Sequence, residues 1–167
     1  PPQESDKGIS LEIFHGAHGR SETDAIIRTF VAMDIGGKPN LLAGFTCTPL
    51  VRFEVERIES PVKLRGTTVA ELGNRNRPLD MIVYEDGGAH YLLIANTARG
   101  VMKVSTKDIG RDEGLTERVG GGGTAGQTYD TINDWKGVVQ LDKLNGKHAL
   151  VLIEDGNALT VRTMPLP

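Results

Sequence analysis

The sequence predicts an all-β fold built from one group of strands that occurs three times. The clearest copy covers residues 80–105, where apolar runs flank Gly87-Gly88 and a third run follows Arg99-Gly100. Paired glycines readily adopt the positive φ angles of a two-residue hairpin turn. Apolar and β-branched runs of this length are typical of strands. No long stretch has an apolar period of 3.6 residues, so we expect almost no helix.

Two further copies lie before and after this one. The earlier copy turns at Gly36-Gly37 and the later copy turns at Asn145-Gly146, each between apolar runs. The second turn residues, Gly37, Gly88 and Gly146, stand 51 and 58 residues apart along the chain. A repeat of about 40–50 residues with several strands in each copy is typical of β-propeller blades.

The repeat resembles that of β-propeller proteins, and the resemblance covers nearly the whole chain after Gly8. We therefore expect three four-stranded antiparallel blades. Residues 1–8 would be a flexible tail, and residues 9–14 alternate apolar and polar side chains and would form a preceding outer strand. The three repeat units are expected at about 26–72, 79–119 and 137–167.

The outermost strand of each blade is the least regular part of the repeat. Thr67–Leu72 and Leu115–Val119 are the expected outer strands of the first and second blades. The glycine-rich run Gly120–Gly126 would be a flexible connection. Residues 128–136 are expected to form a short helical turn or an insertion. The strand at 9–14 would complete the last blade if a partner brought the two ends together.

Three blades do not close a ring, since propellers contain roughly four to eight blades. Open sheet edges and faces favour association. We therefore expect half of a six-bladed or larger ring, completed by a second copy about a two-fold axis or by a companion chain. The alternative is an open array of three sheets or a sandwich.

The composition excludes some partners. A net charge of −3 gives no general attraction to nucleic acid or to an anionic membrane. No stretch approaches the ~20 apolar residues of a membrane span. The single cysteine, Cys47, excludes an internal disulfide. The chain begins Pro1-Pro2-Gln3, and either a proteolytic cut or a removed signal peptide would explain this start. If a signal peptide was removed, the protein is periplasmic or extracellular.

The loops that connect neighbouring blades of a propeller converge on one axial mouth, and here they would be residues 15–24, 73–80 and 120–136. His15 and His18 stand three residues apart beside glycines, with Glu22 close behind. This spacing suits a divalent transition metal. Asp24 or Cys47 could add a further ligand. The alternative is that both histidines are ordinary capping or solvated loop residues.

A group of arginines and asparagines would lie at the same mouth. Guanidinium groups suit carboxylates and phosphates, so the group predicts a site for a small anionic ligand or an acidic partner segment. The alternative is that these side chains order the loops through ion pairs with residues such as Glu22 and Glu71. The expected ligand-binding residues are Arg20, Asn74, Arg75, Asn76 and Arg77.

Two functions remain open at this point. The first is a half-propeller subunit that completes a ring with another chain and presents the polar mouth to a ligand. The second is a subunit of a metal-dependent enzyme, hydrolytic or redox, with the metal at the mouth. No Gly-x-Ser-x-Gly or Cys-x-x-Cys motif occurs in the sequence, so serine-hydrolase and thioredoxin-like functions have no support.

Overall fold

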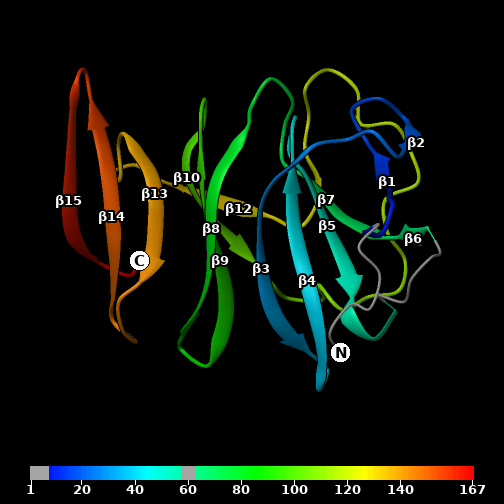
Figure 1. Ribbon diagram of the computed structural model, residues 1–167, viewed down its shortest axis with the longest axis horizontal. Coiled ribbons are helices and arrows are strands. Elements are labelled where there is room, and N and C mark those ends of the chain that lie inside the picture. Colours follow the sequence, from blue (N-terminus) through cyan, green and yellow to red (C-terminus); the bar gives the residue numbers. More distant parts are fainter. Residues whose placement is uncertain (1–7, 58–62) are drawn as a thin grey trace.

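The computed structural model describes residues 8–57 and 63–167, and it is all-β, with four sheets (Figure 1). The expected tail therefore lies outside the described residues except for Gly8. The only helical element in the described part of the chain is one 3-10 turn at Val55–Arg57. Within the same part, no helix combines the length and the apolar character that crossing a membrane requires.

Three of the sheets are large and entirely antiparallel. The first has the order β11-β7-β5-β4-β3, with β3 (Ile27–Ile35), β4 (Lys38–Phe45), β5 (Pro49–Glu54), β7 (Thr67–Glu71) and β11 (Ala125–Gly126). The second has the order β12-β10-β9-β8, with β8 (Pro78–Asp86), β9 (Ala89–Asn96), β10 (Gly100–Ser105) and β12 (Tyr129–Ile132). The third consists of β13 (Val138–Lys143), β14 (His148–Asp155) and β15 (Ala158–Pro165).

The predicted hairpins at Gly36-Gly37 and Gly87-Gly88 are confirmed, and β13 and β14 also form a hairpin, but its turn spans residues 144–147 instead of two residues. Gly36 and Gly37 have φ angles of 61° and 77°, and Gly87 and Gly88 have φ angles of 58° and 79°. These are left-handed angles that glycine adopts without strain, as a tight two-residue turn requires. In consequence the flanking strands β3–β4 and β8–β9 pair in register up to the turn.

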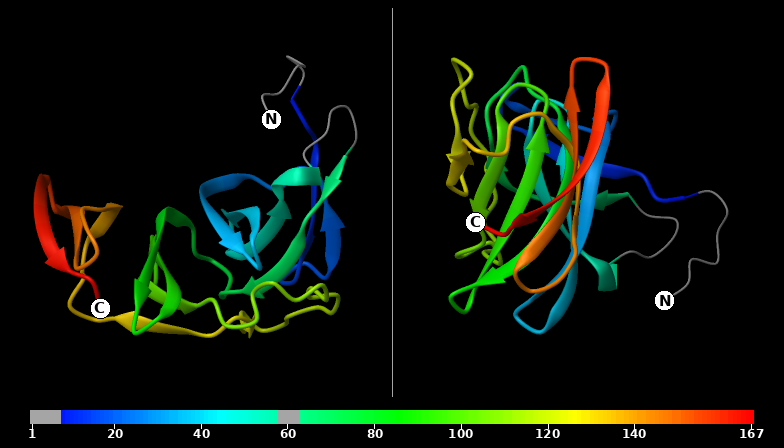
Figure 2. Two further views of the ribbon diagram at one scale, coloured as in Figure 1. Left: turned by 90° about the horizontal axis from the view of Figure 1, so that it is seen from below. Right: turned by 90° about the vertical axis from the view of Figure 1, so that its left-hand side faces the viewer.

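The three large sheets stand in a row, face to face (Figures 1 and 2). The first strands of the sheets, β3, β8 and β13, are neighbours, because β8 contacts both of the others. One apolar core fills the space between the first and second sheets and includes Leu42, Leu92 and Met102. A second core fills the space between the second and third sheets and includes Leu93, Trp135 and Val151.

The fourth sheet is small and covers part of the outer face of the first sheet. It consists of β1 (Leu11–His15) flanked by β2 (Arg20–Glu22) and β6 (Leu64–Arg65). Ile13 of β1 packs against Phe45 and Phe53 of the first sheet. The strand expected at residues 9–14 therefore exists, but its partners are β2 and β6, and it lies at the opposite end of the row from β15 (Figure 1).

The predicted strand at Leu115–Val119 is wrong. This segment is irregular, because its backbone bonds singly to two different neighbours, Leu115 N–H to Thr68 O and Val119 N–H to Gly16 O. The fourth strand of the second sheet is instead β12, in the segment expected to be a helical turn or an insertion. β11 pairs with β7, so the three sheets have five, four and three strands rather than four each.

Candidate metal centre

The β1–β2 hairpin brings the predicted metal ligands together. Glu22 pairs with Ile13 across the hairpin, and Ile13 and His15 are two residues apart on β1. Alternate residues of a strand point to the same face, so His15 and Glu22 share one face of the hairpin. The connecting turn folds back tightly, because the N–H groups of His18 and Gly19 both donate to His15 O. This turn returns the His18 side chain to the same face.

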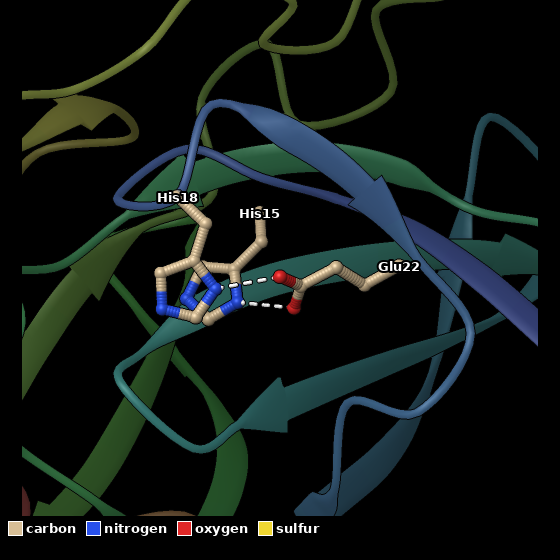
Figure 3. A group of neighbouring side chains, drawn as sticks. All are labelled: His15, His18 and Glu22. Atoms are coloured by element: carbon tan, nitrogen blue, oxygen red, sulfur yellow. Dashed lines mark hydrogen bonds and ion pairs between the residues drawn. The ribbon is translucent and has the colours of Figure 1, made fainter.

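Glu22 contacts both imidazoles at once (Figure 3). His15 Nδ1 lies 2.9 Å from Glu22 Oε2, and His18 Nδ1 lies 2.6 Å from Glu22 Oε1. The centroids of the two imidazole rings are 3.8 Å apart. Arg20 Nε donates a third hydrogen bond to Glu22 Oε1, at 2.9 Å. The three predicted residues and Arg20 therefore form one connected cluster.

Electrostatics keep the Glu22 carboxyl ionised. Burial raises its pKa, but the hydrogen bonds from Arg20, His15 and His18 outweigh burial and hold the pKa at about 2. An ionised carboxylate only accepts hydrogen bonds, so each imidazole presents a protonated Nδ1 to it. A neutral imidazole protonated at Nδ1 has a free lone pair on Nε2.

The Nε2 atoms are the unusual feature of the cluster. In Figure 3 the second ring nitrogen of each histidine lies on the side away from Glu22. His15 is 3% exposed, and its Nε2 is buried without a hydrogen-bond partner. Burial lowers the pKa of His15 and outweighs the hydrogen bond that its ring donates to Glu22, which raises the pKa, so the neutral ring is favoured. A buried polar atom without a partner is uncommon and calls for an explanation.

The cluster has the composition of a metal site. His15, His18 and Glu22 could hold a metal ion, since each offers one ligand atom and these atoms lie within 4.8 Å of one another. Metal-binding histidines commonly donate the N–H of the nitrogen that does not bind the metal to a carboxylate, which fixes the ring and its tautomer. Glu22 stands in that position for both rings.

A second carboxyl beside the cluster, Glu71, was not among the predicted site residues. It ends β7, is 1% exposed, and accepts a hydrogen bond from Ala17 N–H in the histidine turn at 3.2 Å. Burial raises the pKa of Glu71 to about 7, against the backbone N–H groups of Ala17 and Gly16. Its Oε1 has no hydrogen-bond partner. The sequence did contain a signal for this residue, because Glu71 is a charged side chain between the apolar residues Ala70 and Leu72.

A pocket of about 250 Å³ opens beside the histidines. It brings in both of the additional ligands that the sequence suggested, since it is lined by Asp24 and Cys47 as well as His15, His18, Arg20 and Glu22. Cys47 and Thr48 have φ angles of 65° and 67°. Left-handed φ angles at non-glycine residues cost about 1–3 kcal/mol each and often cluster at functional sites.

The predicted anion-binding loop is a neighbour of this pocket but does not line it. Cys47 N–H donates to Asn76 O at 3.0 Å, which joins the loop to the pocket wall. The Asn76 side chain is buried, donates to Asn96 and accepts from Ala98 N–H, so it fixes the loop in place. Arg75 and Arg77 are exposed and Asn74 is half-buried. The ligand-binding role of this loop therefore stays a prediction.

Comparisons of the chain with protein-family models, with curated proteins and with solved structures found no match.

Proposed function

We propose that the three large sheets are adjacent blades of a β-propeller and that the histidine pocket belongs to its axial mouth. Two observations support this arrangement. The first strands of the sheets contact one another in sequence order, as inner strands do around a propeller axis. In Figure 1 the predicted hairpin turns lie along the lower side of the sheets, while the β1–β2 turn lies on the upper side.

We infer that the pocket binds a divalent transition-metal ion through Nε2 of His15 and Nε2 of His18, with Glu22 as their shared hydrogen-bond acceptor. The observation that carries this proposal is the pair of Nδ1 contacts to one carboxylate, which leaves both Nε2 atoms on the side away from it. A purely structural role for the cluster would leave the buried, unpartnered Nε2 of His15 unexplained. Imidazole ligands suit zinc, copper, iron and nickel.

A metal ion at this position would polarise a substrate or activate water, which is the chemistry of a hydrolytic or redox enzyme subunit. The role of the surrounding side chains would be to orient the two imidazole rings. Glu22 holds both rings in one tautomer, and Arg20 holds Glu22. Asp24 lines the pocket and offers a carboxylate to whatever enters it.

Titration with Zn²⁺ of protein purified without a histidine tag tests the proposal. We expect one strong site, which His15→Ala and His18→Ala each abolish. His90→Ala is the matched control, because His90 is exposed and stands on β9, away from the pocket. Glu22→Gln should weaken binding roughly 10–100-fold without abolishing it, as for other hydrogen-bond partners of ligating histidines. Unchanged Zn²⁺ affinity in a His15→Ala/His18→Ala double variant would refute the proposal.

A second candidate function is a half-propeller subunit that completes a ring with a second copy or with a companion chain. The outward face of the third sheet exposes Leu150, Leu159 and Val161, and at the other end of the row Phe30 is 63% exposed. These are the faces that neighbouring blades would cover. Mass measurement in solution tests the assembly, and Leu159→Glu should reduce it. A compact monomer at all concentrations would exclude assembly from copies of this chain.

The same candidate includes an anionic ligand at the mouth. Arg75 and Arg77 are exposed, and neither has an ion pair within residues 8–57 and 63–167. An Arg75→Ala/Arg77→Ala variant should lose affinity for inorganic phosphate or for an acidic peptide if the loop binds anions. Equal phosphate affinity in this variant and in the wild type would exclude the loop.

A further inference from the structure

The outer edge of the third sheet is β15, which also forms one end of the molecule (Figure 1). All of β15 pairs with β14, and no other strand of the described residues pairs with it. The corresponding third strands of the other two large sheets are covered, since β7 pairs with β5 and β12 pairs with β10. The strand that the sequence suggested for this edge, β1, pairs with β2 and β6 instead. The third sheet therefore lacks the outer strand that the other two have.

The pairing with β14 shows which backbone groups of β15 face outward. Leu166 N–H donates to Lys147 O at 2.9 Å, which continues the β14–β15 register one residue beyond the strands. Hydrogen-bonded pairs alternate along an antiparallel ladder, so the even-numbered residues of β15 bond to β14. The odd-numbered residues therefore direct their backbone groups away from the sheet, and Pro165, which has no N–H, is one of them. The residues with outward N–H and C=O groups are Leu159, Val161 and Thr163.

This edge has few of the features that keep edge strands from pairing. Natural edge strands are commonly short or bulged, or they carry several charges or a central proline. β15 runs for eight residues without a register shift, and its one charged residue is Arg162. Leu159 and Val161 are 65% and 61% exposed. An edge of this length and composition favours pairing with another strand.

The sequence of β15 is complementary to itself in one antiparallel register. A two-fold axis at Thr160 places Leu159 opposite Val161 of the second copy, twice, and pairs the two Thr160 side chains. Both kinds of cross-strand pair are favourable, and the outward backbone groups of Leu159 and Val161 then bond to each other. An axis at Arg162 would oppose two like charges, which is unfavourable. An axis at Val161 would place Leu159 opposite the polar Thr163.

The register with the axis at Thr160 is also complementary in charge. Asp155 of β14 is opposite Ala158 of β15, and this register places Arg162 of the second copy opposite Ala158 on its other side. The α-carbons of Asp155 and Arg162 are then two strand spacings apart, about 10 Å, and the small Ala158 lets the arginine side chain lie across toward the carboxylate. Neither charged residue has an ion pair in the part of the chain that the structure describes.

We propose that β15 pairs with β15 of a second copy of the chain about a two-fold axis at Thr160, which joins the two third sheets into one six-stranded antiparallel sheet. A two-fold contact uses the same surface of both copies, as a self-complementary strand requires. The inward side of β15 leaves room for the added side chains, since a groove of about 970 Å³ lies there, lined by Ala158, Thr160, Arg162 and Met164 and by residues of the segment 133–137. The contact uses a sheet edge, whereas ring completion uses sheet faces, so this inference goes beyond both functions proposed above.

Cross-linking through a single cysteine tests the register. In Cys47→Ser/Thr160→Cys the introduced cysteine is the only one in the chain. On the axis its α-carbon would lie about 4.5 Å from that of the second copy, because the Thr160 pair is not hydrogen-bonded, and this separation permits a disulfide. We expect mild oxidation of dilute protein to give a covalent dimer.

The matched control is Cys47→Ser/Val161→Cys. Its two α-carbons would lie diagonally across the axis, about 7–8 Å apart, so this variant should cross-link far less. Cross-linking of the Val161→Cys variant in preference to the Thr160→Cys variant would overturn the register. The absence of a covalent dimer from both variants would overturn the pairing, and a strand from a different protein would then be the occupant of the edge.

A second measurement separates edge pairing from the packing of sheet faces. Val161→Pro removes one outward N–H from each copy but keeps the bonds of the even-numbered residues to β14, so circular dichroism should remain that of the wild type. The loss of two hydrogen bonds should raise the dissociation constant of the dimer roughly tenfold or more, as measured by analytical ultracentrifugation. Leu150→Glu changes the outward face of β14 and should leave the cross-link through Thr160→Cys intact. Equal dissociation constants for Val161→Pro and the wild type would contradict the proposal.

Discussion

The carboxyl of Glu71 should make the protein less stable as the pH rises, and Glu71→Gln should remove that dependence. Burial raises the pKa of Glu71 from 4.5 to about 7 in the folded protein. Between pH 4.5 and about 7 the unfolded chain ionises this group and the folded protein does not, so unfolding releases a proton and becomes easier as the pH rises. The raised pKa lowers the free energy of unfolding by about 3 kcal/mol once the carboxyl is ionised in both states. Most of this loss, about 2–3 kcal/mol, falls between pH 5 and pH 8.

Urea unfolding at pH 5 and pH 8, followed by circular dichroism, measures this effect. Glutamine keeps a carbonyl for the hydrogen bond from Ala17 N–H and has no charge. The free energy of unfolding of Glu71→Gln minus that of the wild type should therefore rise by about 2–3 kcal/mol from pH 5 to pH 8. Glu117→Gln is the control, because Glu117 is exposed. An equal pH dependence in the wild type and Glu71→Gln would show that the carboxyl ionises as it does in water.

Three further changes test other parts of the structure. Gly126→Ala should destabilise the protein by more than about 1–3 kcal/mol, because the added Cβ would lie 2.1 Å from Val69 O and the φ angle is 78°. Gly87→Ala should cost only the backbone strain, because its Cβ would meet no other atom within 4 Å. Chemical denaturation compares the two variants. Trp135→Ala should cost about 3–5 kcal/mol, since Trp135 is 4% exposed in the core between the second and third sheets, and a loss below about 1 kcal/mol would contradict that packing. The pKa of Glu22, about 2 in the folded protein, stabilises the fold above pH 4.5, and this contribution is lost as the pH falls toward 2. Glu22→Gln should therefore be less stable than the wild type at pH 6 and nearly equal to it at pH 2. Acid unfolding curves of the two proteins measure this difference.

The local part of the fold could be predicted from the sequence. The hairpins at Gly36-Gly37 and Gly87-Gly88 follow from paired glycines between apolar runs, a signal contained within about ten residues. The histidine cluster could also be predicted, because His15, His18 and Glu22 lie within one short hairpin. Residues that are close in sequence need little tertiary information to be brought together.

The long-range part could not be predicted. β12 joins the second sheet only after the irregular segment 106–124, and nothing in its four residues distinguishes a strand from an insertion. The importance of Glu71 depends on burial by elements distant in sequence, above all the histidine turn. The buried amide of Asn76 resembles a ligand-binding group in sequence and serves the loop instead.

Residues 125–132 tie two sheets to each other. β11 hydrogen-bonds to β7 of the first sheet, and shortly afterwards β12 hydrogen-bonds to β10 of the second. Local unfolding of residues 125–132 would expose β7 and β10 together, so the amide protons of these two strands should exchange with deuterated solvent at matched rates. During synthesis, moreover, the first sheet acquires its outermost strand only after residue 126 has been made and the second only after residue 132, although all the other strands of both sheets lie between residues 27 and 105.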